Sequence, residues 1–178
     1  MAARFFPLVL FVLLVLSVGC GQTTAITQTA EDTTQPAQPQ GTTYQNARFG
    51  YQFTVPDGTL VYALNLEDQT ARLAGADDEI VFVAGEGTNV LTIRGVEGDE
   101  SLHEWLTDHV AFFYPKGEAA QRIERIDGKQ TIALYGAGTS GSPARLLVTQ
   151  NDDRLIVITF EQEAELFDGI LSTLTFNL

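Results

Sequence analysis

The sequence has little cysteine and few basic residues, and each shortage excludes a class of structure or function. Its 178 residues include a single Cys, so no disulfide can form within the chain and stability must come from an ordinary apolar core. Only 10 Lys and Arg stand against 23 Asp and Glu, which gives a net charge of −13. An acidic chain of this kind repels the phosphates of nucleic acids, which argues against nucleic-acid binding.

The single cysteine, Cys20, directly follows Gly19 at the end of an apolar run over residues 5–18. A basic residue before the run, its short length and the small residues at its end are typical of a secretory signal rather than a membrane span. The stretch Ser17-Val18-Gly19-Cys20 resembles the bacterial lipoprotein signal, in which the thiol takes a diacylglycerol and cleavage makes the cysteine the new N-terminus. We therefore predict a signal peptide at residues 1–19, cleavage between Gly19 and Cys20, and lipid attachment at Cys20.

The predicted processing places the protein at a cell membrane, facing the extracytoplasmic space. The mature chain keeps 9 basic against 23 acidic residues, a net charge of −14, so the lipid must anchor it without help from a basic patch. Residues 20–43 are rich in Thr, Gln and Pro, and we predict a flexible linker spanning roughly 25 Å. Gly21 follows the cysteine, so the aspartate that retains many such proteins at the inner membrane is absent, and the choice between inner and outer membrane stays open.

The remaining residues, 44–178, suffice for one core. Short β-type runs alternate there with Gly, Asp, Asn and Pro, including turns at 56–58, 127–128 and 151–153, and this pattern predicts hairpins in an antiparallel sheet. Leu155–Ile158 is almost wholly apolar, which predicts a strand covered on both faces. The predicted strands are Tyr51–Val55, Leu60–Leu64, Thr70–Ala74, Ile80–Ala84, Val90–Val96, Arg122–Ile126, Thr131–Tyr135, Ala144–Thr149 and Leu155–Phe160.

Two helices complete the predicted α+β fold. Ser101 and Glu104 have the spacing of a capping box, so the first helix should begin there and run to about Tyr114. Its predicted buried stripe comprises Leu102, Trp105, Leu106, His109, Val110, Phe112 and Phe113. The second helix is predicted near Glu163–Leu171, with a buried side formed by Leu166, Phe167, Ile170, Leu171 and Leu174.

Two stretches of the domain carry a family resemblance. Tyr44–Gly58, YQNARFGYQFTVPDG, and Phe167–Phe176, FDGILSTLTF, resemble the opening and the closing segments of PsbP-like extracytoplasmic lipoproteins. The order of strands, one helix, further strands and a last helix is also similar, so the likeness covers residues 44–178. It implies an antiparallel β-sheet covered by helices, a PsbP-like α/β/α sandwich, with a non-enzymatic accessory or partner-binding role.

Three motifs invite a chemical interpretation, and their spacing argues against it. His103 and His109 are six residues apart, whereas zinc-binding helices place two histidines four apart, so we predict no metal there and a hydrogen-bonded core histidine at 109. Residues 136–141 match GxGxxG, but a strand rather than a helix is predicted to follow, which indicates a hairpin loop. The acidic clusters at 77–79, 97–100 and 152–153 lack calcium-loop spacing and are typical of solvated turns.

No residue set has the pattern of a catalytic site, and no cofactor is indicated. The leading hypothesis is therefore a lipid-anchored, extracytoplasmic domain that binds a protein partner and has no enzymatic activity. A binding protein for a small ligand or a cation is the alternative, and an enzyme comes third. A pocket lined by convergent polar groups favours the alternative, whereas an exposed apolar patch over a solid core favours the partner-binding domain.

Overall fold

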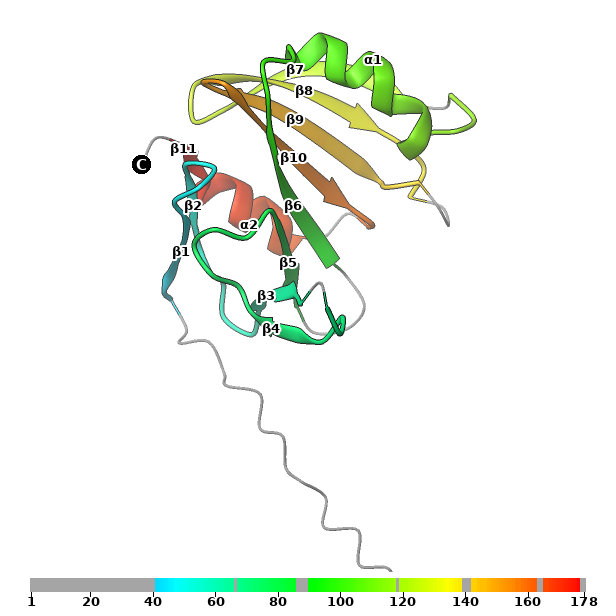
Figure 1. Cartoon of the computed structure of the whole chain (residues 1–178). Coiled ribbons are helices and arrows are strands. Elements are labelled where there is room, and N and C mark those ends of the chain that lie inside the picture. The colour runs from blue at the N-terminus through cyan, green and yellow to red at the C-terminus, as the bar shows by residue number, and fades with distance from the viewer. Residues whose placement is uncertain are drawn as a thin grey trace, which may run out of the picture. The chain divides into compact units, whose positions relative to one another are not determined.

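The computed structural model describes residues 41–65, 67–85, 90–117, 119–138, 142–162 and 165–176 (Figure 1). Their strands pair antiparallel throughout, in a large sheet of order β4-β3-β5-β6-β10-β9-β8-β7 and a small sheet of order β1-β2-β11. The strands are β1 Thr43–Asn46, β2 Tyr51–Thr54, β3 Leu60–Leu64, β4 Ala71–Leu73, β5 Ile80–Ala84, β6 Val90–Glu97, β7 Ala120–Ile126, β8 Lys129–Tyr135, β9 Arg145–Asn151, β10 Arg154–Phe160 and β11 Thr175–Phe176. The predicted antiparallel α+β fold is thus confirmed.

The two helices of the described residues pack on opposite faces of the large sheet. Helix α1, Leu102–Phe113, shares a hydrophobic cluster with side chains of β6, β8, β9 and β10. Helix α2, Glu165–Thr173, and the small sheet share the other cluster with residues of β3, β5 and β6–β10. In β10, for example, Leu155 and Val157 belong to the α1 side, while Ile156 and Ile158 belong to the α2 side. This strand is buried on both faces, as its apolar run predicted.

The capping box and the second helix also match the prediction. The Ser101 hydroxyl accepts a hydrogen bond from the Glu104 amide, and the Glu104 carboxylate accepts one from the Ser101 amide. In α2, Phe167 and Ile170 are buried, as is Leu174 just beyond the helix. Glu163, the predicted start of this helix, lies outside the described residues.

The prediction that His109 lies in the core is wrong, whereas the predicted hydrogen bond is present. The His109 ring is exposed and stacks on the Trp105 indole, with a centroid distance of 4.5 Å and an angle of 9° between the planes. Nδ1 donates a hydrogen bond to the Trp105 carbonyl at 2.9 Å, because that oxygen can only accept. Phe112, also expected inside, is 80% exposed. Within α1 only Leu102, Trp105 and Leu106 are buried, so the buried stripe is narrower than the helical periodicity predicted.

A hydrogen-bonded hairpin loop closes the end of the α2-side core. The Phe49 ring is fully buried, and its amide donates to the Asn46 side chain at 3.0 Å. Asn151 lies in β9, not in the turn predicted for it, and its side-chain amide donates to the carbonyls of Phe49 and Gly50 at 3.1 Å each. Both asparagines are buried because the loop offers them partners. We call the hydrogen bonds of Asn46 and Asn151 to this loop the loop clamp. The strands predicted from the sequence did not reveal it.

Buried tyrosines should make the domain sensitive to alkali. Burial raises the pKa of Tyr44 and that of Tyr114 to about 12, above the ordinary value of about 10. The folded state therefore holds these protons more tightly than the unfolded state, so their contribution to stability is complete below pH 10 and is lost as pH rises through about 12. Each contributes roughly 2–3 kcal/mol, since one pKa unit corresponds to about 1.4 kcal/mol.

Urea unfolding at a series of pH values checks this expectation. The free energy of unfolding should fall between about pH 10 and pH 12, and the fall should be shallower in Tyr44→Phe, which has no phenol to ionise at that position. The substitution also removes the hydrogen bond from the Tyr44 hydroxyl to the Gly75 carbonyl (2.7 Å), so the slope with pH is the informative quantity, not the absolute stability. An unchanged slope in Tyr44→Phe would contradict the prediction.

Candidate functional site

An apolar surface on the large sheet lies on the same face as α1. It is formed by alternate residues of β3, β4 and β5, whose pairing places Tyr62 beside both Leu73 and Phe82. The Tyr62 and Phe82 rings stack with centroids 5.2 Å apart, and Leu64 and Ile80 are 42% and 37% exposed. We call this surface the open face; it comprises Leu60, Tyr62, Leu64, Leu73, Ile80 and Phe82.

The open face exists because α1 covers only part of the sheet. The described side chains that share its cluster come from β6 and β8–β10, not from β3–β5. On the opposite side of β3 and β5, Val61, Ala63, Val81 and Val83 are fully buried. The runs Leu60–Leu64 and Ile80–Ala84 are continuously apolar, a pattern typical of strands covered on both faces. Among the described residues, only one of those faces receives a covering layer.

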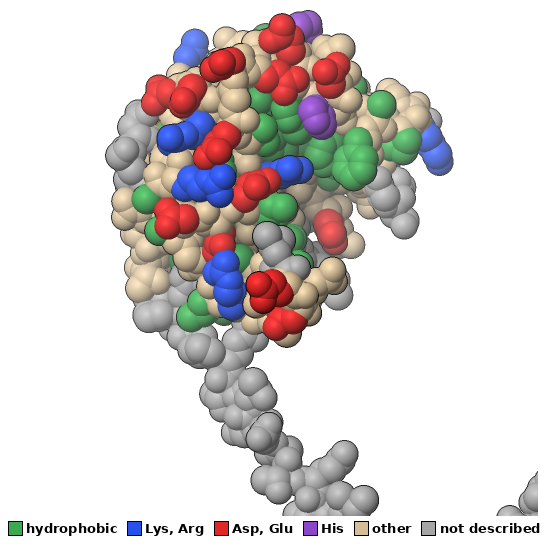
Figure 2. All heavy atoms as spheres, in the orientation of Figure 1, with side chains coloured by type: hydrophobic (Ala, Val, Ile, Leu, Met, Phe, Trp, Pro, Cys, Tyr) green, Lys and Arg blue, Asp and Glu red, His purple; other side chains and the backbone are tan. Residues whose placement is uncertain are grey.

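The α1 helix carries one exposed aromatic side chain, Phe112, beside the half-buried Phe113. Phe112 meets Phe113 edge-on at a centroid distance of 5.2 Å, and Phe113 lies 6.1 Å from the Trp105 ring. Figure 2 shows hydrophobic side chains gathered beside one of the two histidines, both of which belong to α1, while acidic side chains cover neighbouring surface. An exposed aromatic side chain such as Phe112 amid polar surface is typical of protein interfaces.

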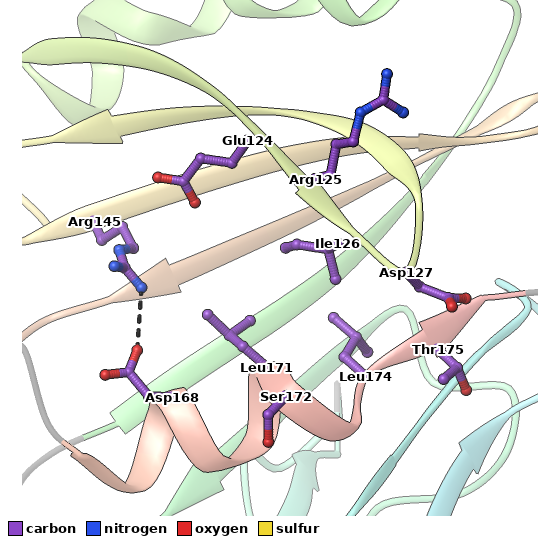
Figure 3. A pocket seen from close by; sticks show the side chains of 10 residues that line it. All are labelled: Glu124, Arg125, Ile126, Asp127, Arg145, Asp168, Leu171, Ser172, Leu174 and Thr175. Carbon is purple, nitrogen blue, oxygen red and sulfur yellow. Dashed lines mark hydrogen bonds and ion pairs between the residues drawn. The ribbon is translucent and has the colours of Figure 1, made fainter.

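A groove of about 500 Å³ runs between α2 and the β7–β8 hairpin (Figure 3). Ile126, Leu171 and Leu174 point toward one another at its floor, while Arg145 faces Asp168 with 3.5 Å between Nη1 and Oδ1. The groove therefore offers apolar contact together with charges of both signs. Its lining comprises Glu124, Arg125, Ile126, Asp127, Arg145, Asp168, Leu171, Ser172, Leu174 and Thr175.

Beside the groove, Tyr135 lies between two arginines. The guanidinium carbons of Arg122 and Arg145 are 5.1 and 4.9 Å from its ring centroid, and its hydroxyl donates to the Glu124 carboxylate. Burial, assisted by that hydrogen bond, raises the pKa of Tyr135. The cation–π contacts and the hydrogen bond hold these three charged side chains and the Tyr135 ring together.

The groove offers no activated nucleophile among its lining residues. The Ser172 hydroxyl donates to the Gly169 carbonyl at 2.7 Å, and both histidines of the chain belong to α1 rather than to this lining. Asp127 is occupied by structure, since its carboxylate accepts from the Phe176 amide at 2.9 Å. The arrangement can bind a group that carries charge and apolar surface together, such as a polypeptide side chain.

Several members of the predicted acidic clusters pair with arginines. Hydrogen bonds from the Arg72 guanidinium and the Gly75 amide outweigh the opposing effect of burial and lower the pKa of Asp78. Glu79 pairs with Arg94 at 3.1 Å, and Glu97 pairs with Arg48 at 2.9 Å. Within the described part of the chain, no three metal-ligating side chains converge on one point. His103 is exposed on α1.

The GxGxxG stretch lies in a β-hairpin, as predicted. Strands β8 and β9, which flank it, pair antiparallel. A Cβ on Gly136 would come within 2.3 Å of the Tyr114 ring and 2.8 Å of the Pro143 carbonyl oxygen, so this glycine serves packing. Residues 139–141 lie outside the described part of the chain.

The residues predicted to attach the chain to a membrane lie outside the described part of the chain. They are Gly19, Cys20, the rest of the predicted signal peptide and the predicted linker up to residue 40. Thr43, the last predicted linker residue, begins β1. No helix in the described ranges has the length and apolar character needed to cross a bilayer.

Comparison with known proteins identifies the architecture. No protein-family profile matches the chain, and no curated protein matches its sequence. Among solved structures, it is similar to the solution structure of cyanobacterial PsbP (CyanoP) from Synechocystis sp. PCC 6803, with a TM-score of 0.50 and 19% sequence identity. The match covers 76% of this chain and 91% of that chain. The domain therefore has a PsbP-like fold, which confirms the resemblance of its first and last segments.

Proposed function

We propose that the protein is a lipid-anchored, extracytoplasmic domain of the PsbP kind, a sheet sandwiched between helices, that binds a protein partner and performs no catalysis. Cys20 provides the anchor, the linker holds the domain away from the lipid, and the open face receives the partner. The acidic charge of the chain, −13, favours a protein over a nucleic acid or an anionic membrane surface.

The open face is the observation that carries this proposal. Leaving Leu64, Leu73 and Ile80 at least one-third exposed keeps apolar area in water, and burying it would gain about 25 cal/mol for each Å². The strands of Leu64 and Ile80, β3 and β5, already contribute buried side chains to the core on the other face of the sheet. A partner that completes the missing layer would gain this free energy on binding.

Site-specific photo-crosslinking in intact cells tests the proposal. A benzophenone amino acid is placed at Phe82, on the open face, or at Thr107, an exposed position of α1, in the full chain. Position 82 should give a discrete adduct of higher mass, and position 107 should not. Introducing Ile80→Asp alongside the probe should reduce the adduct about tenfold, because a buried carboxylate opposes an apolar contact.

The effect of Ile80→Asp on the fold is measured by its melting temperature. Ile80 lies opposite Arg94 in the sheet register, so an aspartate there has a basic neighbour, and the melting temperature should change little. Equal adducts from positions 82 and 107, or an adduct at 82 that Ile80→Asp leaves unchanged, would contradict partner binding at the open face.

The groove beside α2 favours a second candidate, a binding protein for a small charged ligand. Arg145 and Asp168 present opposite charges over an apolar floor, which suits a ligand carrying both signs. Isothermal titration of the protein with amino acids, short peptides, calcium, zinc and manganese tests this function. A heat of binding that is present in the wild type and absent in Arg145→Gln would support ligand binding in the groove. The absence of any heat of binding at millimolar ligand would contradict it.

A further inference from the structure

The β7 strand forms one edge of the large sheet and is long and exposed. It is the last strand in the sheet order, and six of its seven residues are exposed or half-buried. Ile123, at its centre, is 70% exposed. The opposite edge is β4, which has only three residues. Short edge strands resist pairing with other chains, whereas a seven-residue edge is long enough to accept another strand.

The hairpin geometry determines which backbone groups of β7 face outward. Asp127 and Gly128 have φ values of 49° and 75°, as a two-residue type I′ turn requires, and Ile126 pairs directly with Lys129. The pair that closes such a hairpin is hydrogen-bonded, and hydrogen-bonded pairs alternate along the strand. The amide and carbonyl groups that point away from β8 are therefore those of Gln121, Ile123 and Arg125.

The side chains around Ile123 form a self-complementary pattern. Arg122 precedes it and Glu124 follows it. When two copies of β7 run antiparallel with Ile123 opposite Ile123, Arg122 of each copy lies opposite Glu124 of the other. The outward amide and carbonyl groups of Ile123 then face those of Ile123 in the other copy, and those of Gln121 face those of Arg125. We propose that the protein forms a twofold homodimer through this pairing of β7 with β7.

Among registers that keep the outward backbone groups paired, this is the one that sets Arg122 opposite Glu124. A shift by two residues in one direction sets Arg122 opposite its own copy, and a shift in the other direction sets Glu124 opposite its own copy. Both arrangements bring like charges face to face, which destabilises a strand pair. A shift by one residue turns the outward backbone groups of one strand toward inward-facing groups of the other. The pattern thus selects one partner, a second copy of this chain, in one alignment.

Contacts within each copy hold the two charged side chains on the α2 face of the sheet. Arg122 lies over the Tyr135 ring, and Glu124 accepts the Tyr135 hydrogen bond. In the dimer, Arg122 of each copy and Glu124 of the other would lie in non-hydrogen-bonded pairs, in which side chains approach most closely. They would therefore form two equivalent ion pairs. The Ile123 side chains would pack together on the other face. The result is one continuous sheet with both copies of α1 on the same side.

A charge-exchange series on the full processed chain in detergent tests the dimer by density-matched sedimentation. Arg122→Glu and Glu124→Arg should each raise the dimer dissociation constant about tenfold or more, because each converts two complementary pairs into two repulsive ones. The double variant R122E/E124R should restore the wild-type constant. A mixture of the two single variants should form heterodimers, since each supplies the charge that the other lacks.

Two further results keep the test decisive. Ile123→Lys should also dissociate the dimer, because it sets two ammonium groups beside each other, and its exposure lets the fold tolerate the change. All variants retain the lipid anchor, so association through the anchor alone would respond to none of them. A monomeric wild-type chain, or single variants that self-associate as the wild type does, would overturn the proposal. The photo-crosslinks at Phe82 are unaffected by these variants, so the two proposals succeed or fail separately.

Discussion

Replacing Gly95 with alanine should destabilise the domain by about 3 kcal/mol, because the added methyl group has no room. Gly95 lies in β6, and a Cβ built on it would be 2.2 Å from two carbons of the Phe49 ring. That ring is fully buried and its loop is held by the Asn46 and Asn151 side chains, so it cannot swing aside without breaking the clamp. Urea unfolding at neutral pH measures the loss.

A second glycine provides the matched control. Gly169 lies in α2, and a Cβ there would meet nothing within 4 Å. Gly169→Ala should therefore stabilise the protein by about 0.5–1 kcal/mol, since alanine loses less entropy than glycine on joining a helix. If Gly95→Ala proved as harmless as Gly169→Ala, the packing of Phe49 against β6 would be wrong.

Replacing Trp105 with alanine should cost about 3–5 kcal/mol, the range for removing a large buried aromatic side chain. Trp105 is 4% exposed and contacts both the sheet-side cluster of α1 and the His109 ring. Its removal should leave a cavity under the N-terminal half of the helix, because Leu102 and Leu106 on either side keep the helix at its present distance from the sheet. Thermal and urea unfolding should both report the change.

Phe112, on the same helix, should behave in the opposite way. Its side chain is 80% exposed, so Phe112→Ala should change the free energy of unfolding by no more than about 0.5 kcal/mol. Comparable losses in Trp105→Ala and Phe112→Ala would mean that α1 buries a different stripe from the one described. If Phe112→Ala leaves the free energy of unfolding unchanged, the Phe112 ring does not stabilise the fold and is available in the wild type for contacts outside the domain.

Local signals in the sequence predicted much of the fold. Alternating apolar residues, glycine turns and the Ser101–Glu104 capping box specify strands and helix ends through short-range physics, and each of those features appears in the structure. His109 and Phe112 were misplaced because helical periodicity gives the direction of a side chain but not the width of the surface beneath it. The loop clamp depends on Asn46 and Asn151, which are far apart in sequence, so no local pattern predicted it.

The candidate site was only partly visible in the sequence. The continuous apolar runs of β3 and β5 predicted strands but did not reveal that one of their faces lacks a covering layer, because that depends on where α1 packs. The charge pattern around Ile123 is present in the sequence. That it can align two copies of the chain follows only once β7 is known to be an edge strand. The groove beside α2 joins residues of β7, β9, α2 and β11, which local sequence patterns cannot bring together.

Membrane attachment through Cys20 underlies the proposed function, and intact-mass analysis of the mature protein from its native membrane decides it. The chain should begin at Cys20 and carry the added mass of a diacylglycerol on the thiol and a third acyl chain on the new N-terminus. Globomycin treatment, which blocks the lipoprotein signal peptidase, should cause the uncleaved precursor to accumulate. A mature chain with an unmodified thiol, or one that still carries residues 1–19, would contradict a lipid-anchored domain.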